Sequence, residues 1–317
     1  MRILISGGFG FVGGRIAKQL TEVGYKIILG SRSERSPPLW LPHAKVEKID
    51  WHDSGALIKS CHGIDIVIQC AGVNAIDSSK DPEQAFEING MATTRLALAA
   101  KQANVKCFIY LSTAHIYANP LLGVITENTI PANFHPYAAS HLMGEAGVMS
   151  ACQNSPTQAI ILRLANAYGV PMHMDTNCWN LLANELCRQA INHRHLTLNT
   201  SGQQERNFIG LDQVCNAVEY IIAKLNTQSL PTIFNIGSLT STTVLKMAQN
   251  IQERCFSVLG FYPTLEINNT EVKTISKSLD YKICNIQDAG FMMPNSPNYS
   301  ELDELLTYCK NNFAFKL

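Results

Sequence analysis

The chain has 317 residues, of which 46% are hydrophobic and 16% charged, so it has enough apolar material for a globular core. Lys and Arg total 25, as do Asp and Glu, and the formal net charge is zero. This balance argues against nucleic-acid and membrane-surface proteins, because both usually need a basic field. No apolar run approaches the roughly 20 residues of a membrane span, and the first residues do not resemble a targeting segment. We therefore expect a cytoplasmic protein.

Short apolar runs alternate with longer segments of helical periodicity. Strands are predicted at Arg2–Ser6, Lys26–Leu29, Lys45–Ile49, Asp65–Cys70, Cys107–Leu111, Ala159–Leu164 and Thr232–Ile236. Helices are predicted at Val12–Val23, Ser54–Ser60, Pro82–Ala103, Tyr137–Gln153 and Leu211–Lys224. Several strands are apolar almost throughout, as expected for parallel strands covered on both faces. The alternation predicts an α/β fold with a doubly wound parallel sheet.

The pattern changes after Asn166. Helices are predicted at Asn177–Ile191, Thr242–Leu259 and Glu301–Asn312, and a short strand at Thr264–Ile267. We expect a smaller C-terminal α/β domain over the carboxyl ends of the strands. Because the sheet pattern returns over residues 207–236, the first domain is predicted as residues 1–165 and 207–236. The second is predicted as residues 166–206 and 237–317.

A glycine-rich loop joins the first strand to the first helix. Gly7, Gly10 and Gly13 have the GxxGxxG spacing, and Phe9, Phe11 and Val12 lie among them. Glycine permits a tight turn and a close approach of the backbone to a pyrophosphate, and the N–H groups at the helix start then face the phosphates. In this strand–helix context the loop predicts a pocket for a nicotinamide dinucleotide, in a Rossmann-type first domain.

The end of the second strand bears on which dinucleotide binds. An acidic residue there would bind the ribose 2′-hydroxyl of NAD, but Ser31 and Arg32 stand at this place, with Arg35 close behind. Guanidinium matches phosphate geometry, which favours NADP, with NAD as the alternative. Asp50, at the end of the third strand, could accept a hydrogen bond from the adenine amino group, and its neighbour Trp51 is predicted to contact the cofactor as well. Asp50 could equally be a turn residue.

Ten cysteines are spread along the chain. None forms a CxxC pair, and no histidine cluster has metal-ligand spacing. We expect buried free thiols in a reducing compartment and no metal.

Several further motifs resemble those of the extended short-chain dehydrogenase/reductase family, the NAD(P)-dependent nucleotide-sugar epimerases, dehydratases and 4-keto reductases. The likeness runs along nearly the whole chain. The motifs lie at residues 69–72, 87–90, 111–117, 136–145, 162–169, 206–212 and 234–237. The resemblance implies additional cofactor contacts at Cys70, Ala71, Gly72, Asn89 and Leu111.

The resemblance also implies a catalytic set. Thr113 would hydrogen-bond the reacting oxygen, and Tyr137 would exchange a proton with the alcohol or ketone while hydride passes to or from nicotinamide. In the family a lysine four residues after the tyrosine lowers its pKa and binds the nicotinamide ribose. Here that position is His141. A neutral imidazole offers no permanent cation, although it can still bind the ribose. Either the enzyme uses a modified proton path, or it has lost catalysis and kept the pocket.

Substrate contacts follow from the same resemblance. It places the diphosphate of a nucleotide-linked sugar at Asn166 and Arg206, and Asn74 and His115 are candidates for the sugar pocket. The helices at Pro82–Ala103 and Tyr137–Gln153 correspond to those that form a four-helix dimer interface in relatives, so a homodimer is expected by analogy.

Three functions remain open. The first is reduction of a 4-keto sugar, which the Arg32 region favours. The second is epimerisation of a nucleotide sugar with a tightly bound NAD. The third is a non-catalytic NAD(P)-binding regulator or assembly protein of the same fold, which the histidine at 141 would suit. A dehydratase ranks lower, because the residues directly after Thr113 are Ala114 and His115 and neither is acidic.

Overall fold

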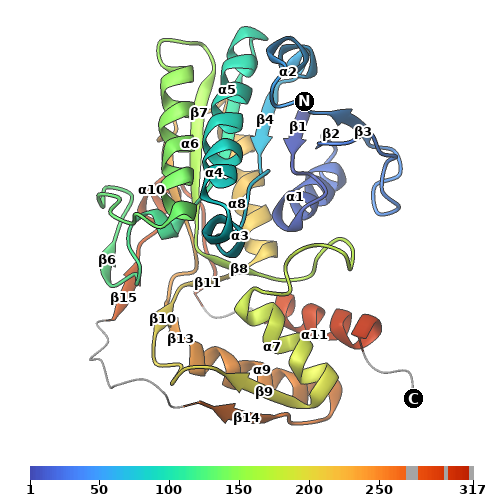
Figure 1. Cartoon of the computed structure of the whole chain (residues 1–317), viewed down its shortest axis with the longest axis vertical. Coiled ribbons are helices and arrows are strands. Elements are labelled where there is room, and N and C mark those ends of the chain that lie inside the picture. The colour runs from blue at the N-terminus through green and yellow to red at the C-terminus, as the bar shows by residue number, and fades with distance from the viewer. Residues whose placement is uncertain (269–277, 296–298, 314–317) are drawn as a thin grey trace.

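The structure, a computed structural model, describes residues 1–268, 278–295 and 299–313. Its largest sheet has seven strands in the order β12-β7-β5-β4-β1-β2-β3, and all neighbouring pairs are parallel (Figure 1). They are β1 (Arg2–Ser6), β2 (Lys26–Ser31), β3 (Lys45–Lys48), β4 (Ile66–Gln69), β5 (Cys107–Thr113), β7 (Gln158–Leu164) and β12 (Ile233–Ile236). The predicted strands and the Rossmann-type fold are confirmed.

Helices cover both faces of this sheet. One face packs against α1 (Phe11–Glu22), α8 (Leu211–Lys224) and α10 (Cys284–Asp288), and the other against α2 (Ser54–Cys61), α5 (Thr93–Gln102) and α6 (Pro136–Cys152). Successive strand residues point to opposite faces. Ile3 and Ile5 therefore lie in the first hydrophobic cluster, whereas Leu4 lies in the second.

The segment predicted as one helix over Pro82–Ala103 is more complex. It consists of α4 (Pro82–Ala85), a π-helix η1 (Phe86–Ala92) and α5, and it follows a short unpredicted helix, α3 (Ala75–Lys80). A π turn changes the hydrogen-bond register without changing the apolar pattern of the sequence, so periodicity does not reveal it. Asn89, a predicted pocket residue, lies inside η1.

A smaller lobe lies beyond the carboxyl ends of β1 and β4, at the bottom of Figure 1. Its helices α7 (Leu182–His193), α9 (Val244–Leu259) and α11 (Ser300–Phe313) share a third hydrophobic cluster. The sequence predicts α7 to begin at Asn177, but turn hydrogen bonds from the amides of Cys178 and Leu181 occupy that segment.

Short strands form four two-stranded pairs outside the large sheet. They are β6 (Gly123–Ile125) with β15 (Leu279–Tyr281), β8 (Asn166–Tyr168) with β11 (Phe208–Gly210), β10 (Glu205–Arg206) with β13 (Thr242–Thr243), and β9 (His195–Leu198) with β14 (Thr264–Ile267). A 3₁₀ turn, η2 (Ala114–Ile116), follows β5. Among these eight strands only β14 is predicted from the sequence, because most of the others have two or three residues and are too short to show a period-two pattern.

The division between domains is only partly visible in the packing. Tyr281, Ile286 and Met293 belong to the hydrophobic cluster of the large sheet, although they follow residue 237. The predicted division stays a prediction.

The ten cysteines are all free, and eight of them are buried. Cys70 is half-buried and Cys284 is exposed, so the expectation of burial is wrong for Cys284. Within the described ranges, no helix is both long and apolar enough to cross a membrane.

A buried ion pair ties the first helix to the last. The Arg15 guanidinium donates to both carboxylate oxygens of Glu301 at 2.6 and 2.8 Å, and the Glu301 side chain is only 1% exposed. The same carboxylate accepts from the amides of Val170 and Asp212. Glu301 therefore joins α1 and α11 to the starts of α8 and of the loop after β8.

Replacing Arg15 with Met is expected to lower the free energy of unfolding by about 3 kcal/mol, because it leaves the Glu301 carboxylate buried without its cation. Urea unfolding measures this loss. The control is Lys18→Met on the same helix, whose ion pair with Glu22 is exposed and should cost less than about 1 kcal/mol. Equal losses in the two variants would contradict the prediction.

Candidate active site

The glycine loop leaves no room for side chains. Gly7 has φ +67°, a Cβ on Gly7 would lie 2.7 Å from the Ala71 amide nitrogen, and a Cβ on Gly13 would lie 2.4 Å from the Gly7 carbonyl oxygen. The N-cap of α1 is Gly10, no side chain caps the helix, and no acidic residue lies in its first turn. The helix start therefore suits an anion, and a dinucleotide pyrophosphate fits the loop.

The loop lies where the strand order reverses. β1 and β4 are neighbours in the sheet. The chain continues from β1 to β2 on one side and from β4 to β5 on the other side. Ligands of such sheets bind at this switch point. Cys70, Ala71 and Gly72 follow β4 at the same edge, beside the glycine loop.

Asn89 holds this edge in place. Its side-chain oxygen accepts from the Val73 amide at 2.7 Å, and its side-chain nitrogen donates to Ser140 Oγ at 3.0 Å. The side chain is fully buried. Asn89 thus fixes the loop after β4 against α6.

No carboxylate follows β2 directly: the strand ends at Ser31, and the next two residues are Arg32 and Ser33. A Cβ on Gly30 would lie 3.0 Å from Ser6 Cα and 3.1 Å from Ile49, so an acidic side chain would not fit there. Ser31 is half-buried and Arg32 is exposed. The Arg35 guanidinium lies 4.4 Å above the Phe9 ring, which brings a second cation to the glycine loop.

The two residues placed at the adenine differ in exposure. Asp50 is exposed, and its carboxylate accepts from the His52 amide at 3.1 Å, as in a turn. Trp51 is 7% exposed and packs in the second hydrophobic cluster, and its indole N–H has no hydrogen-bond partner among the described residues.

The three predicted catalytic residues come together. Thr113 ends β5, Tyr137 lies in the first turn of α6, and His141 follows one turn later, with its ring centroid 4.7 Å from that of Tyr137. Burial raises the pKa of Tyr137, and a hydrogen bond with Thr113 acts in the opposite direction. No charged side chain of the described part of the chain shifts the pKa of this phenol.

His141 is a buried neutral imidazole. It is 7% exposed, and burial lowers its pKa to about 3, with a smaller contribution from His115. Its Nδ1 lies 2.8 Å from the hydroxyl of Tyr110, a residue that the sequence analysis misses. A lysine at this position would place a positive charge beside Tyr137, and the neutral His141 does not.

The predicted substrate residues approach the same place from the other side. The His115 ring lies 6.4 Å from that of Tyr137 and hydrogen-bonds Asn166, whose side-chain nitrogen donates to the Asn207 carbonyl. Burial lowers the pKa of His115 and so does the charge of Arg206. Arg206 is half-buried, and although its backbone pairs with Thr242 in β13, its guanidinium forms no ion pair or hydrogen bond with any described residue.

Asn74, a predicted sugar-pocket residue, caps the helix that follows it, and its predicted contact with a sugar stays a prediction. Its side-chain oxygen accepts from the Asp77 amide at 3.0 Å and so caps α3, while its nitrogen donates to the Asp77 carboxylate. Its amide is therefore already engaged within the loop after β4.

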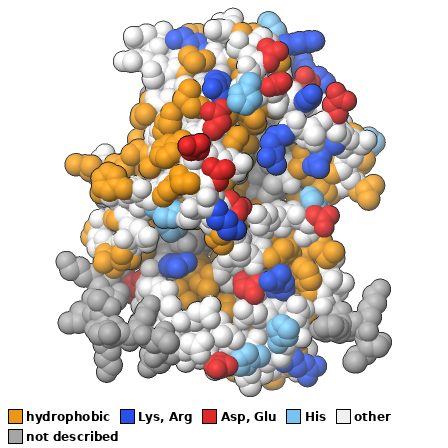
Figure 2. Space-filling view, in the orientation of Figure 1, with side chains coloured by type: hydrophobic (Ala, Val, Ile, Leu, Met, Phe, Trp, Pro, Cys, Tyr) orange, Lys and Arg blue, Asp and Glu red, His pale blue; other side chains and the backbone are white. Residues whose placement is uncertain are grey.

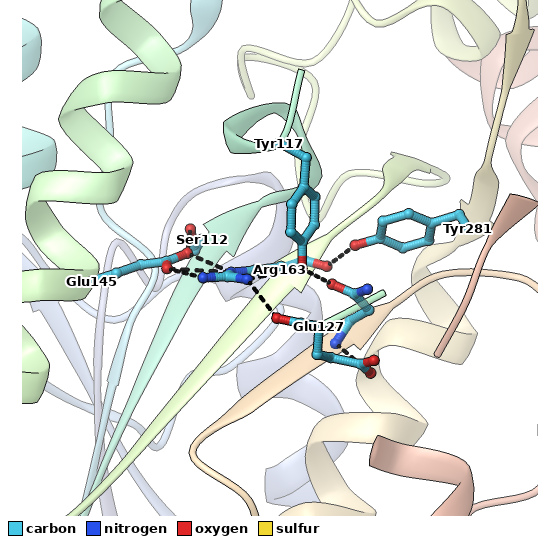
Figure 3. A network of polar contacts seen from close by, with 7 residues as sticks. Ser112, Tyr117, Glu127, Glu145, Arg163 and Tyr281 are labelled. Atoms are coloured by element: carbon cyan, nitrogen blue, oxygen red, sulfur yellow. Dashed lines mark hydrogen bonds and ion pairs between the residues drawn. The ribbon is translucent and has the colours of Figure 1, made fainter. Parts of the chain in front are cut away.

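A buried polar network supports α6 from behind (Figure 3). Glu145, one turn after His141, accepts from the Arg163 guanidinium of β7 at 2.7 Å and from Ser112 Oγ of β5 at 2.5 Å. Arg163 also donates to the Tyr117 hydroxyl, and its carbonyl accepts from Tyr281. The network fixes α6, which carries Tyr137 and His141, against two central strands.

Comparisons with known proteins show which family the chain resembles. A family model described as the NAD dependent epimerase/dehydratase family matches residues 3–237. The UDP-glucose 4-epimerase of Pongo abelii is 25% identical over 283 residues, which cover 80% of this chain and 82% of that protein. A probable low-salt glycan biosynthesis reductase of Haloferax volcanii is 29% identical over 170 residues, 53% of this chain and 54% of that protein.

A solved structure gives the same fold. The UDP-glucose 4-epimerase of Thermus thermophilus, in complex with NAD, superposes with a TM-score of 0.79 at 18% identity, over 98% of this chain and all of that one.

The free energy of unfolding should fall as the pH drops from 6.5 toward 3. In this window the unfolded chain protonates His141, whereas the folded chain keeps it neutral, so unfolding takes up a proton. This group contributes up to about 1.4 kcal/mol per pH unit. Urea unfolding at pH 7 and pH 5 should show a smaller loss in His141→Gln than in the parent.

The pKa of His115 is also lowered, so its protonation on unfolding adds to the loss of stability at low pH. This addition should be similar in the parent and in His141→Gln. His62→Gln, at an exposed position, controls for the removal of a histidine and should keep the parental loss. An identical loss in His141→Gln and the parent would rule out the buried neutral imidazole.

Proposed function

Because the chain belongs to the NAD dependent epimerase/dehydratase family, we propose that it reduces the 4-keto group of a nucleotide-linked sugar with NADPH. The family predicted from the sequence is thereby confirmed, and its solved relatives include complexes with NAD. The observation that carries the choice of reaction is that no cation of the described residues acts on the Tyr137 phenol.

The missing cation favours one direction of proton transfer. A positive charge about 4 Å from the phenol would stabilise phenolate by up to about 4 kcal/mol at an effective dielectric constant near 20. Without it, burial keeps Tyr137 protonated at neutral pH. A protonated phenol is ready to give a proton to a ketone, but it cannot accept one from an alcohol. Reduction is therefore favoured over epimerisation, which begins with oxidation.

The proposed reaction uses three side chains. NADPH, when held by the glycine loop, would supply the hydride for the carbonyl carbon. Tyr137 gives its hydroxyl proton to the carbonyl oxygen, so the ketone becomes an alcohol and the phenolate is later reprotonated from water. The Thr113 hydroxyl orients the same oxygen, and His141 positions the nicotinamide ribose through a ring N–H.

The preference for NADPH follows from the end of β2. Gly30 leaves no space for the carboxylate that would bind a 2′-hydroxyl, and Ser31, Arg32 and Arg35 offer hydroxyl and guanidinium donors instead. These groups suit a 2′-phosphate. Asp50 and Trp51 are proposed to line the adenine end.

The proposed substrate end depends on Arg206. Its half-buried guanidinium lacks an anionic partner among the described residues, its charge acts on His115, and His115 in turn hydrogen-bonds Asn166. A diphosphate would satisfy this guanidinium bidentately. The sugar would then extend toward Tyr137, past His115.

A homodimer is proposed on the evidence of the surface. Figure 2 shows hydrophobic side chains gathered over α5 and α6, and both Leu98 and Met149 of these helices are more than one-third exposed. Two such faces would pack together into four helices.

Two other functions can be separated from this one by experiment. Epimerisation is favoured by the relatives that are named as UDP-glucose 4-epimerases. It predicts a tightly bound NAD that copurifies with the protein and interconversion of two sugars without net oxidation. A non-catalytic role is favoured by His141, and it predicts dinucleotide binding without turnover. Mass spectrometry of the purified protein, followed by assays with a panel of nucleotide 4-keto sugars, decides among the three.

Tyr137→Phe is expected to lower kcat/KM for ketone reduction by about 10²- to 10⁴-fold, because the proton donor is lost. The Kd for NADPH should change by less than about twofold. Consumption of NADPH with a 4-keto nucleotide sugar measures the first quantity, and tryptophan fluorescence the second. Tyr262→Phe, at an exposed position, is the matched control. Retained activity in Tyr137→Phe would exclude the proposed mechanism.

His141→Lys tests the missing cation directly. Restoring a positive charge beside Tyr137 should lower the phenol pKa by about one to three units, so the alkaline limb of kcat/KM for reduction moves to lower pH. Ser150→Lys adds a lysine to an exposed position of the same helix and should leave the profile unchanged. If the limb stays in place in His141→Lys, a different group supplies the proton.

A further inference from the structure

His141 contacts the buried side chain of Tyr110, a residue to which the family resemblance assigns no role. Tyr110 lies on β5, is 1% exposed, and stacks on His141 with ring centroids 5.8 Å apart and an angle of 22° between the planes. Its hydroxyl lies 2.8 Å from His141 Nδ1 and 3.2 Å from the Asn89 carbonyl oxygen. Burial raises the pKa of Tyr110 well above its ordinary value, so this hydroxyl always carries its proton.

From this contact we propose that Tyr110 is a positioning residue: its hydroxyl donates to Nδ1 of His141 and holds the imidazole as the tautomer protonated on Nε2, which binds a ribose hydroxyl of the dinucleotide. The proposal rests on the proposed function for the identity of the ligand. The tautomer itself is a property of the protein alone.

The distances favour this direction of donation. The Tyr110 hydroxyl also hydrogen-bonds the Thr93 side chain, which lowers the phenol pKa and so acts as a donor to it. The one proton of Tyr110 is left with two acceptors, and hydrogen bonds between a hydroxyl and an oxygen normally span 2.5–3.0 Å. The 3.2 Å separation from the Asn89 carbonyl is outside that range, whereas the 2.8 Å separation from Nδ1 is an ordinary hydrogen-bond length. The proton therefore lies toward His141, and Nδ1 is the acceptor.

A glycine makes the contact possible. A Cβ on Gly144 would lie 2.7 Å from the Tyr110 hydroxyl and 2.4 Å from the Asn89 carbonyl oxygen. Helix α6 thus approaches β5 and η1 most closely beside the Tyr110 hydroxyl. This close approach places the phenol of Tyr110 under His141, on the side away from solvent.

The remaining ring nitrogen lies near Gly72, at the proposed dinucleotide site. Nε2 has no hydrogen-bond partner among the described residues, and a Cβ on Gly72 would lie 3.9 Å from the adjacent Cε1. Gly72 follows β4 at the switch point of the sheet. With Nδ1 occupied, Nε2–H is a fixed donor at this edge, without the positive charge of a lysine. Tyr110 therefore preserves ribose binding while the phenol of Tyr137 keeps its proton.

Nitrogen-15 NMR of histidine-labelled protein without ligands tests the tautomer, with His141 assigned by its absence in His141→Gln. We expect an unprotonated Nδ1 and a protonated Nε2 in the parent. In Tyr110→Phe, His141 should show a mixture of tautomers, and the Kd for NADPH should rise about five- to tenfold. Tyr281→Phe is the matched control, because its hydroxyl is equally buried but donates to the Arg163 carbonyl instead.

A protonated Nδ1 in the parent would overturn the proposal, even if Tyr110→Phe did not fold. So would a folded Tyr110→Phe with the parental tautomer and the parental Kd. The outcome is independent of the reaction, since neither readout uses a sugar substrate. An Nε2-protonated His141 in a protein that reduces no 4-keto sugar would refute the proposed function and leave this inference standing.

Discussion

The close packing of α6 against β5 and η1 is the constraint on which the candidate site depends. Gly144 removes the side chain that would separate them, and the next residue, Glu145, holds the helix through its buried ion pair with Arg163. Because residues four apart share a face of a helix, Tyr137 and His141 then point into the same edge of the sheet as Glu145. A site assembled on a strand end and a packed helix has less freedom than one built on loops.

The electrostatics of the site are asymmetric. At the end near α6, burial keeps His141 neutral and Tyr137 protonated. At the other end, Arg206 retains an uncompensated charge within the described part of the chain and discourages protonation of His115. The positive charge is thus concentrated where a diphosphate is proposed to bind and is withheld from the reacting oxygen, which separates binding of an anion from acid–base chemistry.

Sequence periodicity predicted the strands of the large sheet and the long helices, but it missed most of the short elements. The bounds of α8 and β14 match the prediction, because each carries a clear helical or strand pattern. The π turn at η1 and the paired strands of two or three residues leave no such pattern. The partner of His141 also escaped, since Tyr110 precedes it by 31 residues and only the fold joins them. One signal was available: Tyr110 and Ser112 alternate on an otherwise apolar strand, and polar groups on a covered face need partners.

The contact between Arg15 and Glu301 has a consequence for biosynthesis. The two residues are 286 positions apart, so a ribosome exposes the first helix long before the carboxylate that neutralises it. The guanidinium of Arg15 therefore lacks this partner until the segment that carries Glu301 has been synthesised. The contact that joins α1 to α11 can form only after that point.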